Sequence, residues 1–333
     1  MTDQRKTALI FGITGQDGAY LSRFLLEHGY VVHGTSRDAE ISGFSALTSL
    51  NIRQRISMHS ATPTDFRSVL QVITRVAPDE IYNLSGQSSV GLSFQKPMET
   101  LESIAIGTLN ILESIRFLDR PIRFYNSGSG ECFGDTDGQP ANESTPFRPR
   151  SPYSVAKSAA YWEVANYRDS YGLYACSGIL FNHESILRPQ RFVTRKIVAA
   201  AARIARGSTE KLLLGDLSIR RDWGWAPEYV EAMWAMLQQE KPEDFVIATG
   251  VAHSLEEFVA TAFSVSKMNW HDYVYRDPSL LRPSEIRCGF GDTRKAAVKL
   301  GWKSRILMPE IIGHMMKAEF TSLDAIGGQG PKC

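Results

Sequence analysis

Cysteine is scarce in this 333-residue chain. None of its cysteines belongs to a C-x-x-C pair, and their number is too small for a disulfide scaffold in a chain of this length. We therefore expect reduced thiols and no zinc or other metal site. The four cysteines are Cys132, Cys176, Cys288 and Cys333.

Long apolar runs and an excess of either charge are also lacking. No stretch reaches the roughly 18 apolar residues that a membrane span needs, and the first residues lead into a strand-like segment without the apolar core of a signal peptide. The 37 Lys and Arg residues against 36 Asp and Glu residues give a formal net charge of +1. Because no field of one sign surrounds the chain, we expect neither a nucleic acid nor a membrane as partner. These absences predict a cytoplasmic protein.

The chain instead alternates strand-like and helix-like segments. Short apolar segments predict strands at 8–11, 30–34, 56–58, 80–84 and 123–126, and helical spacing predicts helices up to Gly29, at 66–76 and at 98–117. Ser151 and Pro152 predict the start of a further helix that Gly172 ends. This alternation indicates the α/β class, with a doubly wound parallel sheet (Rossmann) covered by helices. Beyond residue 182, helices are predicted at 194–206, 227–240 and 254–265, and strands at 211–214 and 244–248.

Glycines follow the first predicted strand. Gly12, Gly15 and Gly18 let the backbone turn tightly and approach a pyrophosphate, which then faces a helix N-terminus. Glycines also occupy such turns for packing reasons, but their position at the first strand-to-helix turn favours dinucleotide binding. After the second strand, Arg37 favours the 2′-phosphate of NADP, while Asp38 could orient that arginine or bind a ribose. We predict NADP, with NAD as the alternative.

Two pairs of polar residues are candidates for catalysis. Tyr153 and Lys157 lie four residues apart on a predicted helix and project from one face. Tyrosine is a poor base at its usual pKa of about 10, and nearby positive charge lowers that pKa, although many helices carry such a pair without function. Ser129 and Glu131 follow a predicted strand, and the carboxyl ends of parallel strands line the ligand crevice. Ser129 would bond a substrate hydroxyl and Glu131 would act as an acid/base, unless they are a turn hydroxyl and a solvated charge.

Together these features resemble the extended short-chain dehydrogenase/reductases that act on nucleotide sugars, and among them the GDP-mannose 4,6-dehydratases. The resemblance covers about residues 7–318, and its most specific carriers are Asn182-His183-Glu184-Ser185 and Arg221-Asp222-Trp223-Gly224. Further carriers are the segments 12–18, 82–84, 87–88, 150–157, 178–181, 192–196, 244–250 and 282–285.

The resemblance implies roles for individual residues. The implied catalytic residues are Ser129, Glu131, Tyr153 and Lys157. The implied cofactor-binding residues are Gly12, Thr14, Gly15, Gln16, Asp17, Gly18, Arg37, Leu84, Ser85, Gln87, Tyr153, Lys157, His183 and Arg188. The implied substrate-binding residues are Ser88, Ser129, Asn182, Val193, Lys196, Gly215, Arg221, Arg282 and Glu285. Arginines suit a diphosphate and a carboxylate suits a ribose diol.

The implied activity is a lyase reaction, conversion of GDP-mannose to GDP-4-keto-6-deoxymannose. NADP would oxidise C4, water would leave from C5 and C6, and the hydride would return to C6. The alternatives are a GDP-manno-heptose 4,6-dehydratase, which glycines 128 and 130 beside Ser129 would accommodate, or a 4-keto-sugar reductase or epimerase, which needs no acid at position 131. A silent nucleotide-binding regulator is disfavoured because all four catalytic positions hold competent side chains.

The resemblance also implies an organisation of the chain. Residues 1–181 would form an NADP-binding Rossmann domain, 182–326 a smaller nucleotide-sugar-binding lobe interleaved with the sheet, and 327–333 a flexible tail. The helices near 98–117 and 152–170 would form a homodimer; a homotetramer is the alternative. This chain departs from the better-known dehydratases after Arg37, where a second arginine and a longer arm are missing, and at Thr62, which replaces an acid near the adenine.

Overall fold

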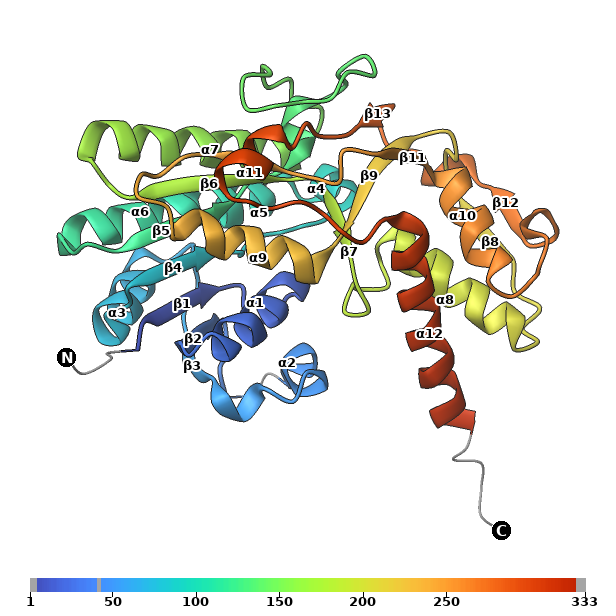
Figure 1. Cartoon of the computed structure of the whole chain (residues 1–333), viewed down its shortest axis with the longest axis horizontal. Helices are drawn as coiled ribbons and strands as arrows, with labels where there is room; N and C mark the ends of the chain where they lie inside the picture. The colour runs from blue at the N-terminus through green and yellow to red at the C-terminus, as the bar shows by residue number, and fades with distance from the viewer. Residues whose placement is uncertain (1–4, 41–42, 328–333) are drawn as a thin grey trace, which may run out of the picture.

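A seven-stranded sheet, parallel throughout, forms the centre of the molecule (Figure 1). This structure, a computed structural model, describes residues 5–40 and 43–327. The strands in spatial order are β10 (Phe245–Ile247), β6 (Ala175–Leu180), β5 (Arg123–Ser127), β4 (Glu80–Asn83), β1 (Thr7–Phe11), β2 (Val31–Ser36) and β3 (Ser57–Ser60). The predicted α/β class and doubly wound parallel sheet are confirmed. Cys333 and the rest of the predicted tail after residue 327 lie outside the described residues.

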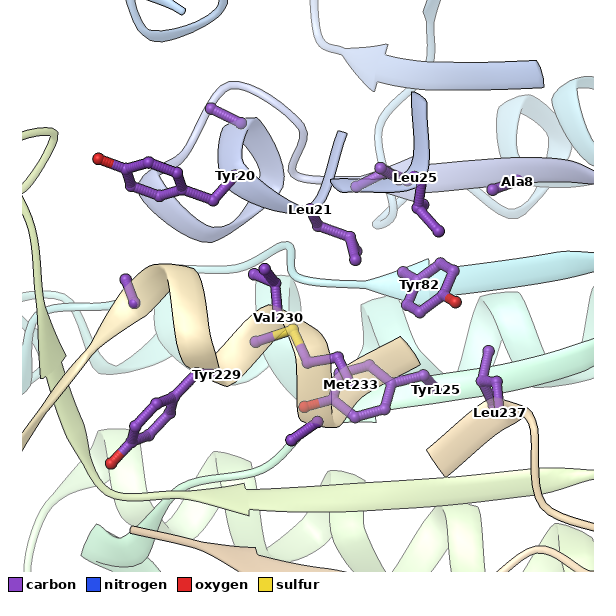
Figure 2. Close-up of a cluster of buried hydrophobic side chains, with 14 of the residues drawn as sticks. Ala8, Tyr20, Leu21, Leu25, Tyr82, Tyr125, Tyr229, Val230, Met233 and Leu237 are labelled. Atoms are coloured by element: carbon purple, nitrogen blue, oxygen red, sulfur yellow. The ribbon is translucent and has the colours of Figure 1, made fainter. Parts of the chain in front are cut away.

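Helices cover both faces of this sheet. Those on one face are α1 (Gln16–Glu27) and α9 (Ala226–Leu237), and those on the other are α3 (Phe66–Val76), α6 (Gly107–Leu118) and α7 (Pro152–Tyr171). Successive strand residues point to opposite faces, so Ala8 packs with α1 and α9 whereas Leu9 packs with α3, α6 and α7. Figure 2 shows the first of these two cores, where Leu21 of α1 and Val230 of α9 meet over the sheet. Because both faces are buried, the strands read as continuous apolar runs.

The start and end of α7 follow from its local sequence. Ser151 caps the helix in a reciprocal capping box with Ser154, Pro152 occupies its first turn, and Gly172 ends it with a φ of +67°. The predicted helix at 98–117 is divided into α5 (Pro97–Leu101), a π-helical turn η2 (Glu102–Ile106) and α6. These boundaries place the first turns of α7 beside the end of β5.

A second group of elements packs around β9 (Arg220–Trp225). Its partners are β7 (Asn182–Glu184), β11 (Ala252–Ser254) and β13 (Cys288–Gly289). The remaining elements are α8 (Val193–Ala205), α10 (Leu255–Ser264), α11 (Arg294–Lys299), α12 (Met308–Gly327), the pair β8 (Leu212–Leu214) and β12 (Val274–Arg276), and short helices α2 (Ser45–Ser49), η1 (Arg53–Arg55), α4 (Val90–Gln95), η3 (Gly130–Phe133), η4 (Trp270–Asp272) and η5 (Pro278–Leu280). Apolar residues of α8, α10 and α12 form a separate core. Among the described helices, none has both the length and the apolar character for crossing a bilayer.

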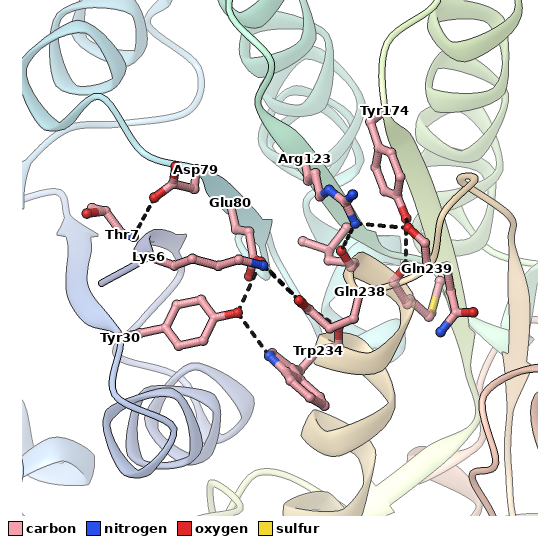
Figure 3. Close-up of polar contacts among 12 residues, drawn as sticks. Lys6, Thr7, Tyr30, Asp79, Glu80, Arg123, Tyr174, Trp234, Gln238 and Gln239 are labelled. Carbon is pink, nitrogen blue, oxygen red and sulfur yellow. Dashed lines mark hydrogen bonds and ion pairs between the residues drawn. The ribbon is translucent and has the colours of Figure 1, made fainter. Parts of the chain in front are cut away.

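A buried carboxylate closes the amino end of the sheet. Glu80 at the start of β4 accepts hydrogen bonds from Lys6 at 3.0 Å, Tyr30 at 3.1 Å and Gln238 at 3.1 Å (Figure 3). It also accepts a hydrogen bond from Tyr82 at 2.8 Å. Four donors compensate the loss of hydration that burial imposes on a charge. This network lies at the end of the sheet opposite to the carboxyl ends of the strands, so it stabilises the fold without entering the site.

Candidate active site

A cavity of about 750 Å³ opens beside the glycine turn. The predicted cofactor residues that line it are Gly12, Thr14, Gly15, Gln16, Asp17, Gly18, Arg37, Leu84, Ser85, Gln87 and Arg188. Thr62, which replaces the acid expected near an adenine, lines the same cavity. Residues from five separate segments of the chain thus surround one space large enough for a nucleotide.

Close backbone packing explains two of the glycines in this turn. Gly12 has a φ of +83°, and a Cβ there would lie 2.6 Å from the main chain of Leu84. A Cβ on Gly18 would lie 2.5 Å from the Gly12 carbonyl oxygen and the Ile13 Cα. The helix α1 begins at Gln16 without a side-chain cap, so its first amides remain available to an anion. The turn therefore has the geometry of a dinucleotide cradle.

A second cavity, of about 320 Å³, adjoins the first. The predicted site residues that line this cavity include Ser88, Ser129, Glu131, Tyr153, Lys157, Asn182, His183, Val193, Arg221 and Arg282. Asp17, Arg188 and the loop around Ser85 line both cavities. The structure therefore brings the four predicted catalytic residues to one space that is continuous with the glycine turn.

Tyr153 and Lys157 reach this space from the first two turns of α7. The Lys157 ammonium donates to the Ser127 carbonyl at 2.7 Å and to its hydroxyl at 3.2 Å, and it lies 5.9 Å from the centre of the Tyr153 ring. Burial lowers the pKa of Lys157 to about 8. Burial also raises the pKa of Tyr153, whereas a hydrogen bond with Ser129 lowers it. The charge of Arg188 lowers this pKa as well, but burial outweighs both contributions, so the pKa of the phenol lies above its usual value and the predicted lowering by Lys157 is not seen.

Glu131 faces the cavity and contacts a predicted substrate residue. Its carboxylate Oε1 lies 3.7 Å from Arg221 Nε, and 14% of its side chain is exposed. The same arginine bonds Glu285 Oε1 through Nη2 at 2.7 Å, and Arg282 bonds that oxygen at 3.2 Å. Strand β9 brings Arg221 to this point, and the turn η3 after β5 brings Glu131. Predicted catalytic and substrate residues thus form one charge cluster.

Asp17 and His183 form an ion pair that the sequence reasoning did not anticipate. Their Oδ2 and Nε2 atoms lie 2.9 Å apart, and His183 Nδ1 lies 2.7 Å from the Phe181 carbonyl oxygen. Both ring nitrogens face acceptors, an arrangement that favours the doubly protonated imidazole. Burial opposes either charge, but the attraction between the two residues raises the pKa of His183 and lowers that of Asp17 to about 2.

Three of the predicted substrate residues, Lys196, Gly215 and Glu285, lie outside the lining of both cavities, although Glu285 bonds Arg221 and Arg282, which line the smaller one. Lys196 Nζ donates to the Leu213 carbonyl at 2.7 Å, and a Cβ on Gly215 would lie 3.2 Å from the Leu280 carbonyl oxygen. By contrast, Arg191 lines both cavities, although no motif singled it out, and it donates to Ser88 at 3.3 Å. The positive charge of Arg191 in the loop before α8 is the sequence feature that could have identified it as a site residue.

No group of three or more His, Cys, Asp or Glu residues within 5–40 and 43–327 could hold a metal ion. A phenol, an ammonium, a hydroxyl and a carboxylate surround the smaller cavity, and the glycine turn lies beside the larger one.

Comparisons with known proteins extend over nearly the whole chain. The family signature described as GDP-mannose 4,6 dehydratase matches residues 9–315. GDP-mannose 4,6 dehydratase 2 of Arabidopsis thaliana is 46% identical over 326 residues, which cover 95% of this chain and 87% of that protein.

Two solved structures share the fold. One is dTDP-glucose 4,6-dehydratase from Bacillus anthracis in complex with NAD, with a TM-score of 0.83, 17% identity, and coverage of 96% of this chain and 98% of that one. The other is RMD from Pseudomonas aeruginosa complexed with NADPH, with a TM-score of 0.78, 19% identity, and coverage of 96% and 98%. The structural likeness establishes the fold, and the sequence match extends over nearly all of it, so this chain belongs to the GDP-mannose 4,6-dehydratase family.

Proposed function

We propose that this protein is a GDP-mannose 4,6-dehydratase that converts GDP-mannose to GDP-4-keto-6-deoxymannose and releases one water. The observation that carries the proposal is the position of Glu131, whose carboxylate shares the smaller cavity with Tyr153. A reductase or epimerase of this fold needs the tyrosine and lysine alone, whereas a dehydratase also needs a base for the C5 proton. The family membership and the name of the Arabidopsis relative support the same activity.

The proposed cofactor is a nicotinamide dinucleotide in the larger cavity. When bound, it supplies a positively charged ring that accepts the C4 hydride and later returns it to C6. We propose NADP because the exposed Arg37, the residue after β2, lines this cavity and is a suitable partner for a 2′-phosphate. NAD is the alternative, since one of the two structural neighbours is a complex with NADPH and the other is a complex with NAD.

In the first step, Tyr153 accepts the proton of the C4 hydroxyl. Ser129 hydrogen-bonds that hydroxyl and the phenol, and Lys157 adds positive charge beneath the ring. The oxidised C4 becomes a ketone, which acidifies the neighbouring C5–H bond.

In the second step, Glu131 removes the C5 proton, and the C6 hydroxyl leaves with a proton as water. A double bond between C5 and C6 results. Hydride then adds to C6 and a proton returns to C5, which leaves the 4-keto-6-deoxy sugar. The net change is the loss of one water, and no external reductant is consumed.

For the GDP moiety we propose Arg221 and Arg282 as diphosphate contacts and Glu285 as the ribose contact. Planar guanidinium groups match phosphate oxygens, and all three residues already lie within one cluster of ion pairs. Ser88, Asn182 and Val193 line the smaller cavity, as Arg221 and Arg282 do, and complete the proposed substrate site.

Packing against neighbouring residues accounts for the two glycines beside Ser129. A Cβ on Gly130 would lie 2.9 Å from the Phe181 ring, and a Cβ on Gly128 would lie 3.0 Å from the Gly178 carbonyl oxygen. Both glycines are thus required by the contact of this segment with β6 and the residue after it. A larger sugar is not needed to explain them.

We further propose that residues 1–181 form the NADP-binding domain and 182–326 the nucleotide-sugar lobe, with β10 and α9 of the latter returning to the sheet. A cytoplasmic location is proposed as well; Cys132, Cys176 and Cys288 are unpaired. For the assembly we propose a homodimer. The exposed apolar side chains on α5, α6 and α7 that support it are Met98, Phe117, Val155, Trp162 and Tyr171.

The direct test incubates the purified protein with GDP-mannose and no added reductant, followed by mass spectrometry of the nucleotide sugar and of any cofactor released on denaturation. The proposal expects a product lighter by one water that reacts as a ketone. Turnover that requires added NADPH, with no loss of water, would indicate the reductase instead. Binding of GDP and cofactor without turnover would indicate a regulator.

A further inference from the structure

We infer that Arg221 is a positioning residue for Glu131: it orients the carboxylate that removes the C5 proton, beyond any contact with the GDP diphosphate. The inference rests on the proposed dehydratase function. It starts from the contact of 3.7 Å between Arg221 Nε and Glu131 Oε1, which joins a predicted substrate residue to a predicted catalytic one.

Arg221 has one fixed orientation. Its side chain is buried on β9, with 5% of the residue exposed. Nη1 donates to the carbonyl oxygens of Arg220 at 3.0 Å and Ile286 at 2.8 Å, and Nη2 donates to Glu285 Oε1 at 2.7 Å. Because the guanidinium is planar and rigid, these three bonds determine where its Nε edge points. That edge faces Glu131.

Glu131 depends on this contact for its side-chain position. Its backbone is held by the short turn η3, where its amide donates to the Ser129 hydroxyl at 3.2 Å. Among the described residues, Arg221 is the one ion-pair partner of its carboxylate. A glutamate side chain otherwise samples several rotamers, so one partner decides the direction of the carboxylate.

The type of contact also suits a base. At 3.7 Å the pair is an ion pair without a hydrogen bond, so the carboxylate keeps lone pairs that can receive a proton. A base acts efficiently only when its oxygen lies within about 3–3.5 Å of the reacting centre, and a misplacement of about 1 Å costs on the order of 100-fold in rate. Oxidation at C4 uses Tyr153 and does not require this geometry. Loss of Arg221 should therefore slow removal of the C5 proton much more than oxidation at C4.

Arg282 provides a matched control. It lines the same cavity and bonds the same Glu285 oxygen at 3.2 Å, but within the described part of the chain it forms no ion pair or hydrogen bond with Glu131. Arg221→Lys and Arg282→Lys both keep a positive charge and both replace a planar fork by a single ammonium. If either arginine serves the diphosphate alone, its lysine variant raises the KM for GDP-mannose and leaves the relative rates of the two steps unchanged at saturation.

The experiment measures both steps at saturating GDP-mannose. Absorbance of the reduced nicotinamide in a single turnover reports C4 oxidation, and deuterium incorporation at C5 from heavy water reports proton removal. For Arg221→Lys we expect C5 exchange to fall about 10- to 100-fold with C4 oxidation much less affected, so that reduced cofactor accumulates. For Arg282→Lys we expect the ratio of the two rates to match the wild type. Equal slowing of both steps in Arg221→Lys, or a loss that excess substrate restores, would overturn the inference.

Further measurements keep the inference testable if the Arg221→Lys protein does not fold. Thermal unfolding and GDP titration check each preparation. Glu285→Leu, which removes the acceptor of the shortest bond from Arg221, should also slow removal of the C5 proton more than oxidation at C4, and an unchanged ratio of the two rates in a folded Glu285→Leu protein would also overturn the inference. Wild-type protein that gives neither C5 exchange nor a keto product would reject the proposed function instead, whatever the variants do.

Discussion

Asp17 in the first turn of α1 and His183 in β7 form a partly buried ion pair, with 2.9 Å between Oδ2 and Nε2, that joins the glycine turn to the wall of the smaller cavity. The residues are 166 positions apart in the chain. The pair ties the dinucleotide cradle to the segment that follows β6, so its charge state affects both stability and the shape of the site.

The ion pair predicts a dependence of stability on pH. The pKa of His183 is raised above its usual value of 6.5, so its contribution is fully present below that value and is lost as pH rises through the raised pKa. The pKa of Asp17 is lowered from 3.8 to about 2, so its contribution is present above 3.8 and is lost as pH falls through about 2. Urea unfolding across pH 5 to 9 should show that His183→Asn costs about 3 kcal/mol near pH 6 and less at pH 9. A cost that does not vary with pH would mean that the histidine is neutral.

Glu131→Gln should retain GDP and cofactor binding and C4 oxidation, because neither needs the carboxylate. Exchange of the C5 proton with solvent should fall by about 100-fold or more, since a side-chain amide does not act as a base near neutral pH. The exposed Glu240→Gln is the control and should behave as the wild type. Retained C5 exchange in Glu131→Gln would remove this residue from the mechanism.

Gly18→Ala should abolish cofactor binding and lower stability, because its Cβ would lie 2.5 Å from two backbone atoms of the turn. Gly313→Ala in α12 is the matched change in another helix. Nothing lies within 4 Å of a Cβ there, so stability should rise by about 0.5–1 kcal/mol. Cofactor titration and urea unfolding measure the two effects. A Gly18→Ala protein that binds the cofactor normally would refute the proposal that the glycine turn holds the dinucleotide.

Glu80→Ala should lower the free energy of unfolding by about 3–5 kcal/mol, because it leaves Lys6, Tyr30 and Tyr82 without their shared acceptor. The network lies away from the cavities, so the KM for GDP-mannose should not change at temperatures where the variant is folded. Urea unfolding and steady-state kinetics test the two halves of this prediction separately.

Trp162→Glu should convert the proposed homodimer to a monomer, because it replaces a large apolar side chain on α7, 62% exposed in the single chain, with a charge. Val298→Glu on α11 is the control, since 84% of that valine is exposed on a different helix. Light scattering coupled to size-exclusion chromatography gives the mass of each. A wild-type monomer would reject the dimer.

Elements with strong local signals were predicted well. The helix α3 has the predicted bounds, and Asp65 caps it through two backbone amides. The strand β9 and the helix α12 were not predicted. In β9 the charged Arg221 and Asp222 are fully or nearly buried, which no local pattern of polarity indicates. Asp222 is stabilised there by the backbone and hydroxyl of Thr249 and by the amide of Gly250, partners that the fold alone supplies.

The amino-acid sequence by itself determined the alternation of strands and helices, the glycine turn and the residue types of the catalytic set, because each follows from local conformational preference and from chemistry that a side chain carries wherever it lies. Tertiary structure alone decided which charges meet. Glu131 reaches Arg221 because β5 and β9 converge at one cavity, and Asp17 reaches His183 because α1 and β7 do the same. Contacts between side chains so distant in the chain depend on how whole elements pack, and no local pattern encodes them.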